Sequence, residues 1–261
     1  MTSIHAKSKL VRLCHAVATS TFGSQHPRDV REFLRSFLQY PIRHVGDKAI
    51  RATTPIAFSN FFNVEQPVQV CIEPTDMDRM EFNTRLDEEI LIGIAISQLK
   101  ALNIFEIGTF NGQTTKRMAE CAGPEANVYT LDLSPERLDA LNIDWFKGCN
   151  IGEKFHHSAV ASRIKQLYVG STPFDFSPYF GKMDFVFVDA EHDYANVLSD
   201  TAAAMKIVRP GGVIFWHDFI PQWSGLVHAV RESTHGYPLV RITGTSFAAI
   251  RVPEEGFRTV K

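Results

Sequence analysis

The hydrophobic pattern of the chain changes at about residue 86, where short apolar runs begin to alternate with segments of helical period. Short apolar runs are typical of strands buried on both faces, and helices between them are typical of connections between parallel strands. We therefore predict an α/β domain whose mostly parallel sheet has helices on both faces. The candidate strands in this region are Asn103–Ile107, Val128–Leu133, Gln166–Val169, Met183–Val188 and Val213–Trp216.

The end of the chain carries two further apolar runs, Tyr237–Ile242 and Ser246–Val252, separated by only three residues. Three residues are too few for a helical crossover, so these runs are predicted to form an antiparallel hairpin that closes one edge of the sheet. The sheet is thus expected to have seven strands, with the last one antiparallel.

The first 85 residues do not follow this alternation, and we assign them to an N-terminal helical extension that precedes the domain at 86–261. Within the extension, apolar residues at helical spacing between Val30 and Leu38 predict an amphipathic helix. The helix could pack on the domain, cover a substrate or form a dimer contact, and the sequence does not choose among these roles.

Composition narrows the class of protein. The 261 residues include 27 Lys and Arg against 29 Asp and Glu, a net charge of −2, which argues against a general nucleic-acid or anionic-membrane binder. The sequence contains no apolar run of the roughly 18 residues that a membrane span needs. Four widely separated cysteines suit reduced thiols, and we expect a cytoplasmic protein.

Two motifs suggest a nucleoside cofactor. Glu106, Gly108 and Gly112 follow an E-x-G-x-x-x-G spacing, with Thr109 and Phe110 inside it, where a strand meets a helix. The glycines permit a tight turn and a close approach of a ligand, and the acid suits a ligand with an ammonium group. Asp132 ends the next strand, 26 residues after Glu106, where a carboxylate can accept hydrogen bonds from ribose hydroxyls. A purely structural turn and a helix-dipole role for Asp132 remain alternatives.

Residues 86–252 resemble a class I S-adenosylmethionine-dependent methyltransferase, with FEIGTFNG as the first motif and VYTLDL as the second. The resemblance implies a Rossmann-like sheet of order 3214576. It also implies that Glu106, Gly108 and Gly112 line the methionine end of the cofactor, that Asp132 holds the ribose and that Ser171 lies near the adenine. The resulting cofactor-binding set is Glu106, Gly108, Thr109, Phe110, Gly112, Asp132, Ser171 and Asp189.

A third group, Asp189, His192, His217 and Asp218, follows the fourth and fifth candidate strands, at the sheet edge where open α/β proteins bind ligands. Asp189 and His192 are three residues apart, so one helical turn would place both over one pocket. The pattern resembles small-molecule O-methyltransferases, most closely macrolide-sugar O-methyltransferases and cephalosporin-hydroxylase-like proteins. That resemblance implies a divalent metal held by Asp189, His217 and Asp218.

Because residue 217 is a histidine, the sequence does not decide which metal ion is bound, or whether one is bound. Magnesium prefers oxygen ligands, whereas imidazole is better suited to manganese, iron or zinc. Because adjacent strand residues point to opposite faces, His217 could instead turn into the core and leave Asp218 alone at the site.

The function we predict is transfer of a methyl group from S-adenosylmethionine to a hydroxyl oxygen of a small molecule. His192 is the expected general base, with Asp189 orienting it or the metal. Two rivals are a cofactor-binding interaction protein without turnover and a nicotinamide-dependent oxidoreductase, although the G-x-G-x-x-G spacing of the latter is absent. A homodimer through the N-terminal helix is also expected.

Overall fold

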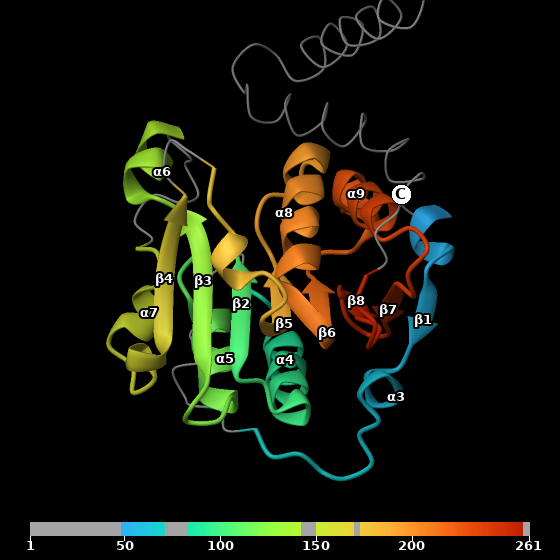
Figure 1. Ribbon diagram of the computed structural model, residues 1–261, viewed down its shortest axis with the longest axis horizontal. Helices are drawn as coiled ribbons and strands as arrows, with labels where there is room; N and C mark the ends of the chain where they lie inside the picture. The colour runs from blue at the N-terminus through green and yellow to red at the C-terminus, as the bar shows by residue number, and fades with distance from the viewer. Residues whose placement is uncertain (1–47, 71, 73–82, 142–149, 170–172, 258–261) are drawn as a thin grey trace, which may run out of the picture.

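The computed structural model of the chain describes residues 48–70, 72, 83–141, 150–169 and 173–257 (Figure 1). The predicted amphipathic helix at Val30–Leu38 and the predicted adenine contact Ser171 lie outside these residues. None of the described helices is both long and apolar enough to cross a membrane.

Eight strands form one sheet in the described part of the chain, in the order β1-β7-β8-β6-β5-β2-β3-β4. Strand β8 is antiparallel to both of its neighbours, and every other pair is parallel. The strands are β1 (Thr54–Ile56), β2 (Asn103–Ile107), β3 (Asn127–Leu133), β4 (Ile164–Val169), β5 (Met183–Val188), β6 (Val208–Trp216), β7 (Val240–Ile242) and β8 (Ala248–Arg251).

The α/β class is confirmed, and β2 to β8 occur in the predicted order with the last strand reversed. The predicted count of seven was wrong by one, because β1 comes from the segment assigned to the extension. It pairs with β7, with Thr54 opposite Val240, so the predicted hairpin does not form the outer edge of the sheet. Strand β6 also begins earlier than expected, and a register shift between Met183 and Phe185 on β5 accommodates its first residues.

Two hydrophobic cores lie on opposite faces of the sheet, because successive strand residues point to opposite sides. Phe105 and Val186 belong to one core, whereas Ile104 and Phe185 belong to the other. Helices α8 (Tyr194–Ile207) and α9 (Ser224–Ser233) cover the first face, and α4 (Leu86–Leu99) and α5 (Gln113–Cys121) cover the second (Figure 1). The short helices are α3 (Phe58–Phe62), α6 (Pro135–Leu141) and α7 (Glu153–His156).

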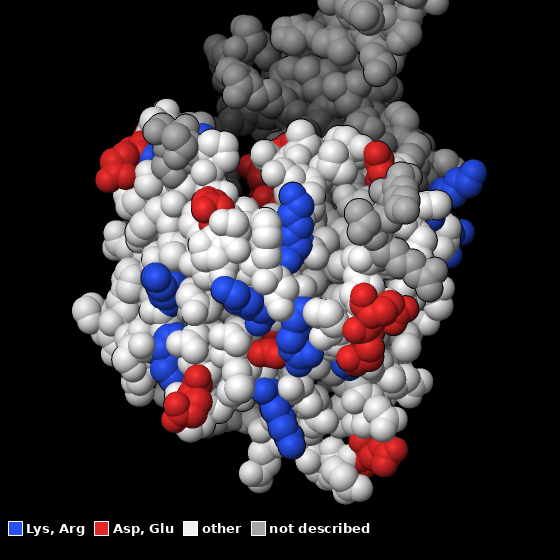
Figure 2. Space-filling view, viewed as in Figure 1, with Lys and Arg blue, Asp and Glu red and all other residues white. Residues whose placement is uncertain are grey.

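Charged side chains on the face shown in Figure 2 are mixed in sign. Lys and Arg gather across the middle of this face, with Asp and Glu among and beside them. Elsewhere in the described residues, charges also pair directly, as in the hydrogen bond of 2.5 Å from Arg209 Nε to Asp184 Oδ1. The expected lack of a nucleic-acid partner stays a prediction.

Backbone hydrogen bonds join the segments that follow three central strands. The N–H of Asp189 donates to Ile107 O at 2.8 Å, and the N–H of His217 donates to Val188 O at 3.0 Å. The residues that follow β2, β5 and β6 therefore lie side by side. This carboxyl edge carries the candidate active site.

Candidate active site

The turn after β2 has an unusual backbone. Gly108, Phe110 and Gly112 have φ values of 101°, 49° and 81°, which L-residues with a Cβ adopt at a cost. A Cβ on Gly108 would lie 2.0 Å from Asp189 O, and one on Gly112 would lie 2.5 Å from the Phe155 ring. Both glycines are thus required by contacts within the chain, and the approach of a ligand at Gly112 stays a prediction.

Asp132 supports this turn from the end of β3. Its Oδ2 accepts hydrogen bonds of 2.9 Å from the N–H groups of both Thr109 and Phe110, and its Oδ1 accepts one of 2.7 Å from Leu133 N–H. Burial raises the pKa of Asp132, and these backbone hydrogen bonds oppose the rise. Asp132 therefore links the two motifs that the sequence assigns to the cofactor.

The carboxyl group of Glu106 lies below the turn and is buried. It accepts hydrogen bonds from the hydroxyls of Thr115 and Thr130, the latter at 2.6 Å. Burial raises its pKa to about 8, more than these hydrogen bonds lower it. At neutral pH the group is mostly a neutral acid, so its described partners are two hydroxyls and its predicted contact with an ammonium group stays a prediction.

Asp189, at the end of β5, and His217, at the end of β6, contact each other. His217 Nδ1 lies 3.1 Å from Asp189 Oδ1, and its Nε2 lies 3.2 Å from Oε2 of Glu88 on α4. The second oxygen of Glu88 accepts a hydrogen bond of 2.6 Å from Ser246 N–H. Thr84 Oγ1 donates to the other oxygen of Asp189 at 3.3 Å. His217 is thus held between two carboxylates.

The pKa values in this group shift in the directions that ion pairing requires. Burial alone would lower the pKa of His217, but the charge of Asp189 and the hydrogen bonds to Asp189 and Glu88 raise it well above its usual value of 6.5. Burial alone would raise the pKa of Glu88, but the hydrogen bonds from His217 and Ser246 outweigh that effect and lower it. The pKa values of His217 and Glu88 therefore shift in the directions that their contact with each other produces.

His192 contacts Asp218 rather than Asp189. Its Nε2 lies 3.2 Å from Asp218 Oδ2, but that buried nitrogen has no partner in hydrogen-bond alignment among the described residues. The imidazole stacks on Trp223, with ring centroids 4.5 Å apart and planes inclined by 16°. Burial raises the pKa of Asp218, but contact with His192 and the charge of His217 lower it by more.

The structure pairs Asp189 with His217, so the predicted orientation of His192 by Asp189 was wrong, whereas the alternative that Asp189 orients a metal stays a prediction. The predicted orientation assumed a helical turn directly after β5, whereas residues 189–192 are not helical. Helix α8 begins at Tyr194, because the Asp193 side chain caps it by accepting from the N–H groups of Ala195 and Asn196. Asp189 consequently faces His217.

Metal binding by Asp189, His217 and Asp218 is not shown and stays a prediction. Among the described residues, no group of three or more His, Cys, Asp and Glu side chains has a geometry that could hold an ion. Asp189, His217 and Asp218 are neighbours, but both ring nitrogens of His217 are engaged by carboxylates. We therefore derive no chemical step through a metal.

The sequence pattern missed Glu88 and Thr84. Helix α4 carries Asp87, Glu88 and Glu89 in its first turn, where acids are normally interpreted as exposed groups that favour the helix dipole. Glu88 is instead 1% exposed. The sequence feature that could have revealed Glu88 is the pair Glu88 and Glu89 directly before the apolar residues of α4.

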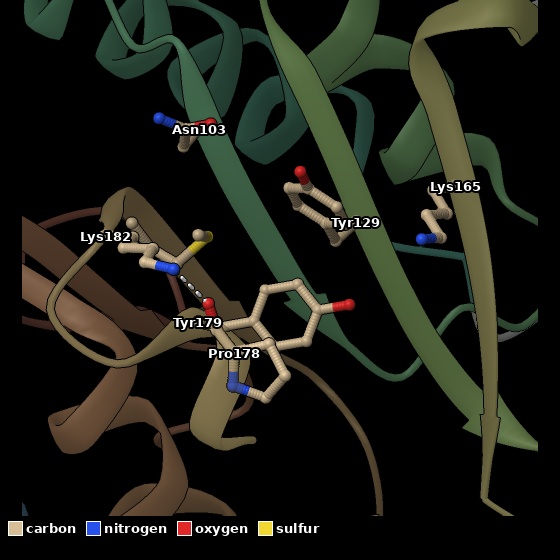
Figure 3. Close-up of a pocket in the computed structure, with 7 residues that line it drawn as sticks. Asn103, Tyr129, Lys165, Pro178, Tyr179 and Lys182 are labelled. Atoms are coloured by element: carbon tan, nitrogen blue, oxygen red, sulfur yellow. Dashed lines mark hydrogen bonds between the residues drawn. The ribbon is translucent and has the colours of Figure 1, made fainter. Parts of the chain in front are cut away.

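A pocket of about 440 Å³ lies away from this edge, near residues that begin β2, β4 and β5 (Figure 3). None of the predicted site residues lines it. Because parallel α/β sheets bind ligands at the carboxyl ends of their strands, we do not place the active site there. The lining residues are Asn103, Tyr129, Lys165, Pro178, Tyr179, Lys182 and Met183.

Comparisons with known proteins agree with the fold and the motifs. A family model described as a methyltransferase domain matches residues 105–219, from the glycine turn to the segment after β6. A putative caffeoyl-CoA O-methyltransferase from Arabidopsis thaliana is 22% identical over 220 residues, which cover 84% of this chain and 80% of the relative. A catechol O-methyltransferase from Mycobacterium tuberculosis is 29% identical over 118 residues, which cover 44% of this chain and 47% of the relative.

Among solved structures, a cofactor-bound protein from MTB aligns with a TM-score of 0.53 at 20% identity, over 87% of this chain and 98% of that one. The sheet order and the family match together support a class I S-adenosylmethionine-dependent methyltransferase. The curated relatives that the chain resembles are O-methyltransferases.

Proposed function

We propose that the chain methylates a hydroxyl oxygen of a small molecule, with His192 as the general base. The observation that carries the proposal is the position of His192 Nε2. This nitrogen is buried at the carboxyl edge of the sheet, 3.2 Å from Asp218 Oδ2, and has no aligned hydrogen-bond partner among the described residues. A buried polar atom of this kind calls for a partner, and an acceptor hydroxyl would supply one.

Different residues of the chain would bind the cofactor and accept the proton. The turn of Gly108, Thr109, Phe110 and Gly112, supported by Asp132 and Glu106, would hold the cofactor, with Ser171 near its adenine. S-adenosylmethionine supplies a methyl group that its sulfonium makes electrophilic. The acceptor oxygen forms the new bond to the methyl carbon as the carbon–sulfur bond breaks, and the hydroxyl proton moves to His192 Nε2. General-base help of this kind is typically worth about 10² to 10⁴-fold.

The acceptor we propose is a phenolic hydroxyl. Two curated relatives carry the names of phenolic acceptors, caffeoyl-CoA and catechol. Trp223, which is 40% exposed, offers a flat aromatic surface next to His192. Aromatic rings gain about 0.5 to 1.5 kcal/mol from such contacts beyond the area they bury.

Calorimetry and a transfer assay test the proposal. The protein should bind S-adenosylmethionine and not NAD or NADP, which separates methyl transfer from the oxidoreductase alternative. With methyl-labelled cofactor and catechol or caffeoyl-CoA as probes, His192→Gln should lose at least about 100-fold in kcat and keep its cofactor affinity. His235→Gln, at an exposed histidine beyond α9, is the matched control. Equal activity of both variants would reject His192 as the base.

The proposed methyl transfer does not depend on the oligomeric state of the protein. A homodimer through the N-terminal helix is proposed and is checked by light scattering, where the mass of one chain would reject it.

A further inference from the structure

We propose that the pocket shown in Figure 3 is a second ligand site, which binds a small aromatic carboxylate. The pocket lies near the amino ends of β2, β4 and β5, whereas the candidate active site follows the carboxyl ends of β2, β5 and β6. The two sites are therefore at opposite edges of the sheet. The inference goes beyond the proposed methyl transfer and does not depend on it.

The pocket has positive charge that no carboxylate of its lining offsets. Two lining residues are lysines, and none is acidic. Among the described residues, Lys165 has no ion-pair partner, and the Lys182 ammonium has one acceptor, Pro178 O at 2.6 Å. An ammonium group has three N–H donors, so both lysines can still donate to an anion.

The acid closest in sequence to this lining, Asp184, is bound by other groups. Its Oδ2 accepts the backbone N–H groups of Leu102 and Asn103 at 2.9 Å and 2.8 Å. Its Oδ1 accepts the Nε–H of Arg209 at 2.5 Å. The Asp184 carboxylate therefore has its own cation, and the two lysine charges of the pocket are available to a ligand.

Two tyrosine rings form an aromatic wall, and Figure 3 shows them between the two lysines. The rings of Tyr129 and Tyr179 have centroids 5.1 Å apart and planes inclined by 67°. Tyr179 also meets the fully buried Phe105 edge to face, with centroids 5.1 Å apart. Because the core holds these rings in place, an aromatic ligand can pack against them without first ordering the wall.

The hydroxyls of this wall can bind a carboxylate. Neither Tyr129 nor Tyr179 has a hydroxyl hydrogen bond to another described residue. Burial and the nearby Tyr129 raise the pKa of Tyr179, so its hydroxyl keeps the proton and can donate it in a hydrogen bond. The side-chain amide of Asn103 lines the same pocket and adds two N–H donors.

The size of the pocket favours an organic ligand over an inorganic ion. Its volume of about 440 Å³ lies within the range of roughly 300 to 1,000 Å³ for small-molecule sites. A phosphate ion would reach the lysines but would leave the tyrosine wall uncovered. An aromatic ring with one carboxylate would use both the wall and the lysines.

Calorimetry with 2-naphthoate tests the site, because this molecule has no hydroxyl that the proposed reaction could methylate. Titration of the full-length protein should give saturable binding, with the same affinity in the presence and absence of S-adenosylmethionine. The neutral 2-naphthamide and inorganic phosphate should each bind at least about tenfold more weakly. No saturable binding of 2-naphthoate up to millimolar concentration, equal affinity for either comparison molecule, or competition with S-adenosylmethionine would overturn the proposal.

Three lysine variants separate contact in the pocket from a general positive field. Lys165→Gln and Lys182→Gln should each weaken 2-naphthoate binding about three- to tenfold, and the double variant at least about tenfold. Lys206→Gln is the matched control, because it removes the same charge from an exposed lysine of α8 that does not line the pocket. Its affinity should equal that of the wild type. Equal losses in all three single variants would reject a specific site.

Nuclear magnetic resonance locates the ligand without relying on a variant's affinity. In protein with ¹³C-labelled tyrosine rings, 2-naphthoate should shift the Tyr129 and Tyr179 signals, which Tyr129→Phe and Tyr179→Phe assign. The exposed Tyr168 and Tyr194, outside the pocket, should keep their shifts. Shifts confined to those two residues would contradict the proposal. If the protein fails to bind S-adenosylmethionine, the proposed function fails while these results still decide the second site.

Discussion

Gly108 and Asp189 approach each other so closely that a single added carbon atom at position 108 would lie 2.0 Å from the Asp189 carbonyl oxygen. The approach joins the turn that begins the cofactor motif to the strand end that carries the second group of site residues. The two halves of the candidate site are therefore held in register by backbone packing, independently of any ligand.

Replacement of Gly108 by alanine should consequently be severe. The φ of 101° costs a non-glycine residue about 1 to 3 kcal/mol, and the contact with Asp189 O adds a clash with backbone that cannot move cheaply. We expect Gly108→Ala to lose more than about 3 kcal/mol in urea unfolding and to abolish cofactor binding. Gly236→Ala is the control, since its φ is 86° but nothing lies within 4 Å of the added carbon. A similar loss in both variants would show that the close approach is unimportant.

The stack between His192 and Trp223 predicts a split between catalysis and cofactor binding. Trp223→Ala removes the surface that holds the imidazole plane, so kcat/KM should fall about three- to tenfold, the kinetic equivalent of about 0.5 to 1.5 kcal/mol. Affinity for S-adenosylmethionine should stay the same, and Trp223→Phe should recover most of the activity. An equal fall in cofactor affinity would show that Trp223 acts on the cofactor instead of on His192.

Asp132 allows its structural role to be separated from a contact with ribose. Asp132→Ala leaves the Thr109 and Phe110 N–H groups without their acceptor, and an unsatisfied buried group costs about 1 to 3 kcal/mol. Asp132→Asn retains one acceptor oxygen and should keep most of the stability. If Asp132 also binds the ribose, Asp132→Asn should still weaken S-adenosylmethionine binding measured by calorimetry. Unchanged affinity in Asp132→Asn would leave Asp132 with the structural role alone.

Much of the fold could be predicted from the sequence, because doubly buried strands leave short apolar runs such as Phe185–Val188. Strand β1 was missed because it has only three residues and pairs with β7, far away in the sequence. Long-range contacts of this kind leave no local period.

The sequence predicted where the site lies, but not which of its side chains contact each other. Local spacing placed Asp189 and His192 together, yet residues 189–192 are not helical, and Asp189 contacts His217, which follows the neighbouring strand. Glu88 was missed because its partners, His217 and Ser246, are 129 and 158 residues away along the chain. Only the tertiary structure brings these charges together.

The buried acid Glu106 predicts an unusual dependence of stability on pH. Its usual pKa is 4.5, and burial raises the folded-state value to about 8. Between these values the folded chain holds a proton that the unfolded chain has lost. The contribution of Glu106 to the free energy of unfolding is therefore fully present below about pH 4.5 and declines as the pH rises to about 8.

A comparison with Glu106→Gln isolates this contribution from that of other ionisable groups. The carboxamide is neutral at every pH, and its oxygen can still accept the hydroxyls of Thr115 and Thr130. The free energy of unfolding, wild type minus variant, should fall across the same pH window by an amount on the order of a few kcal/mol. The variant should therefore gain relative to the wild type as the pH rises, and above pH 8 the difference should be constant. Parallel pH profiles of the two proteins in chemical denaturation would mean that Glu106 ionises as readily in the folded protein as in the unfolded chain.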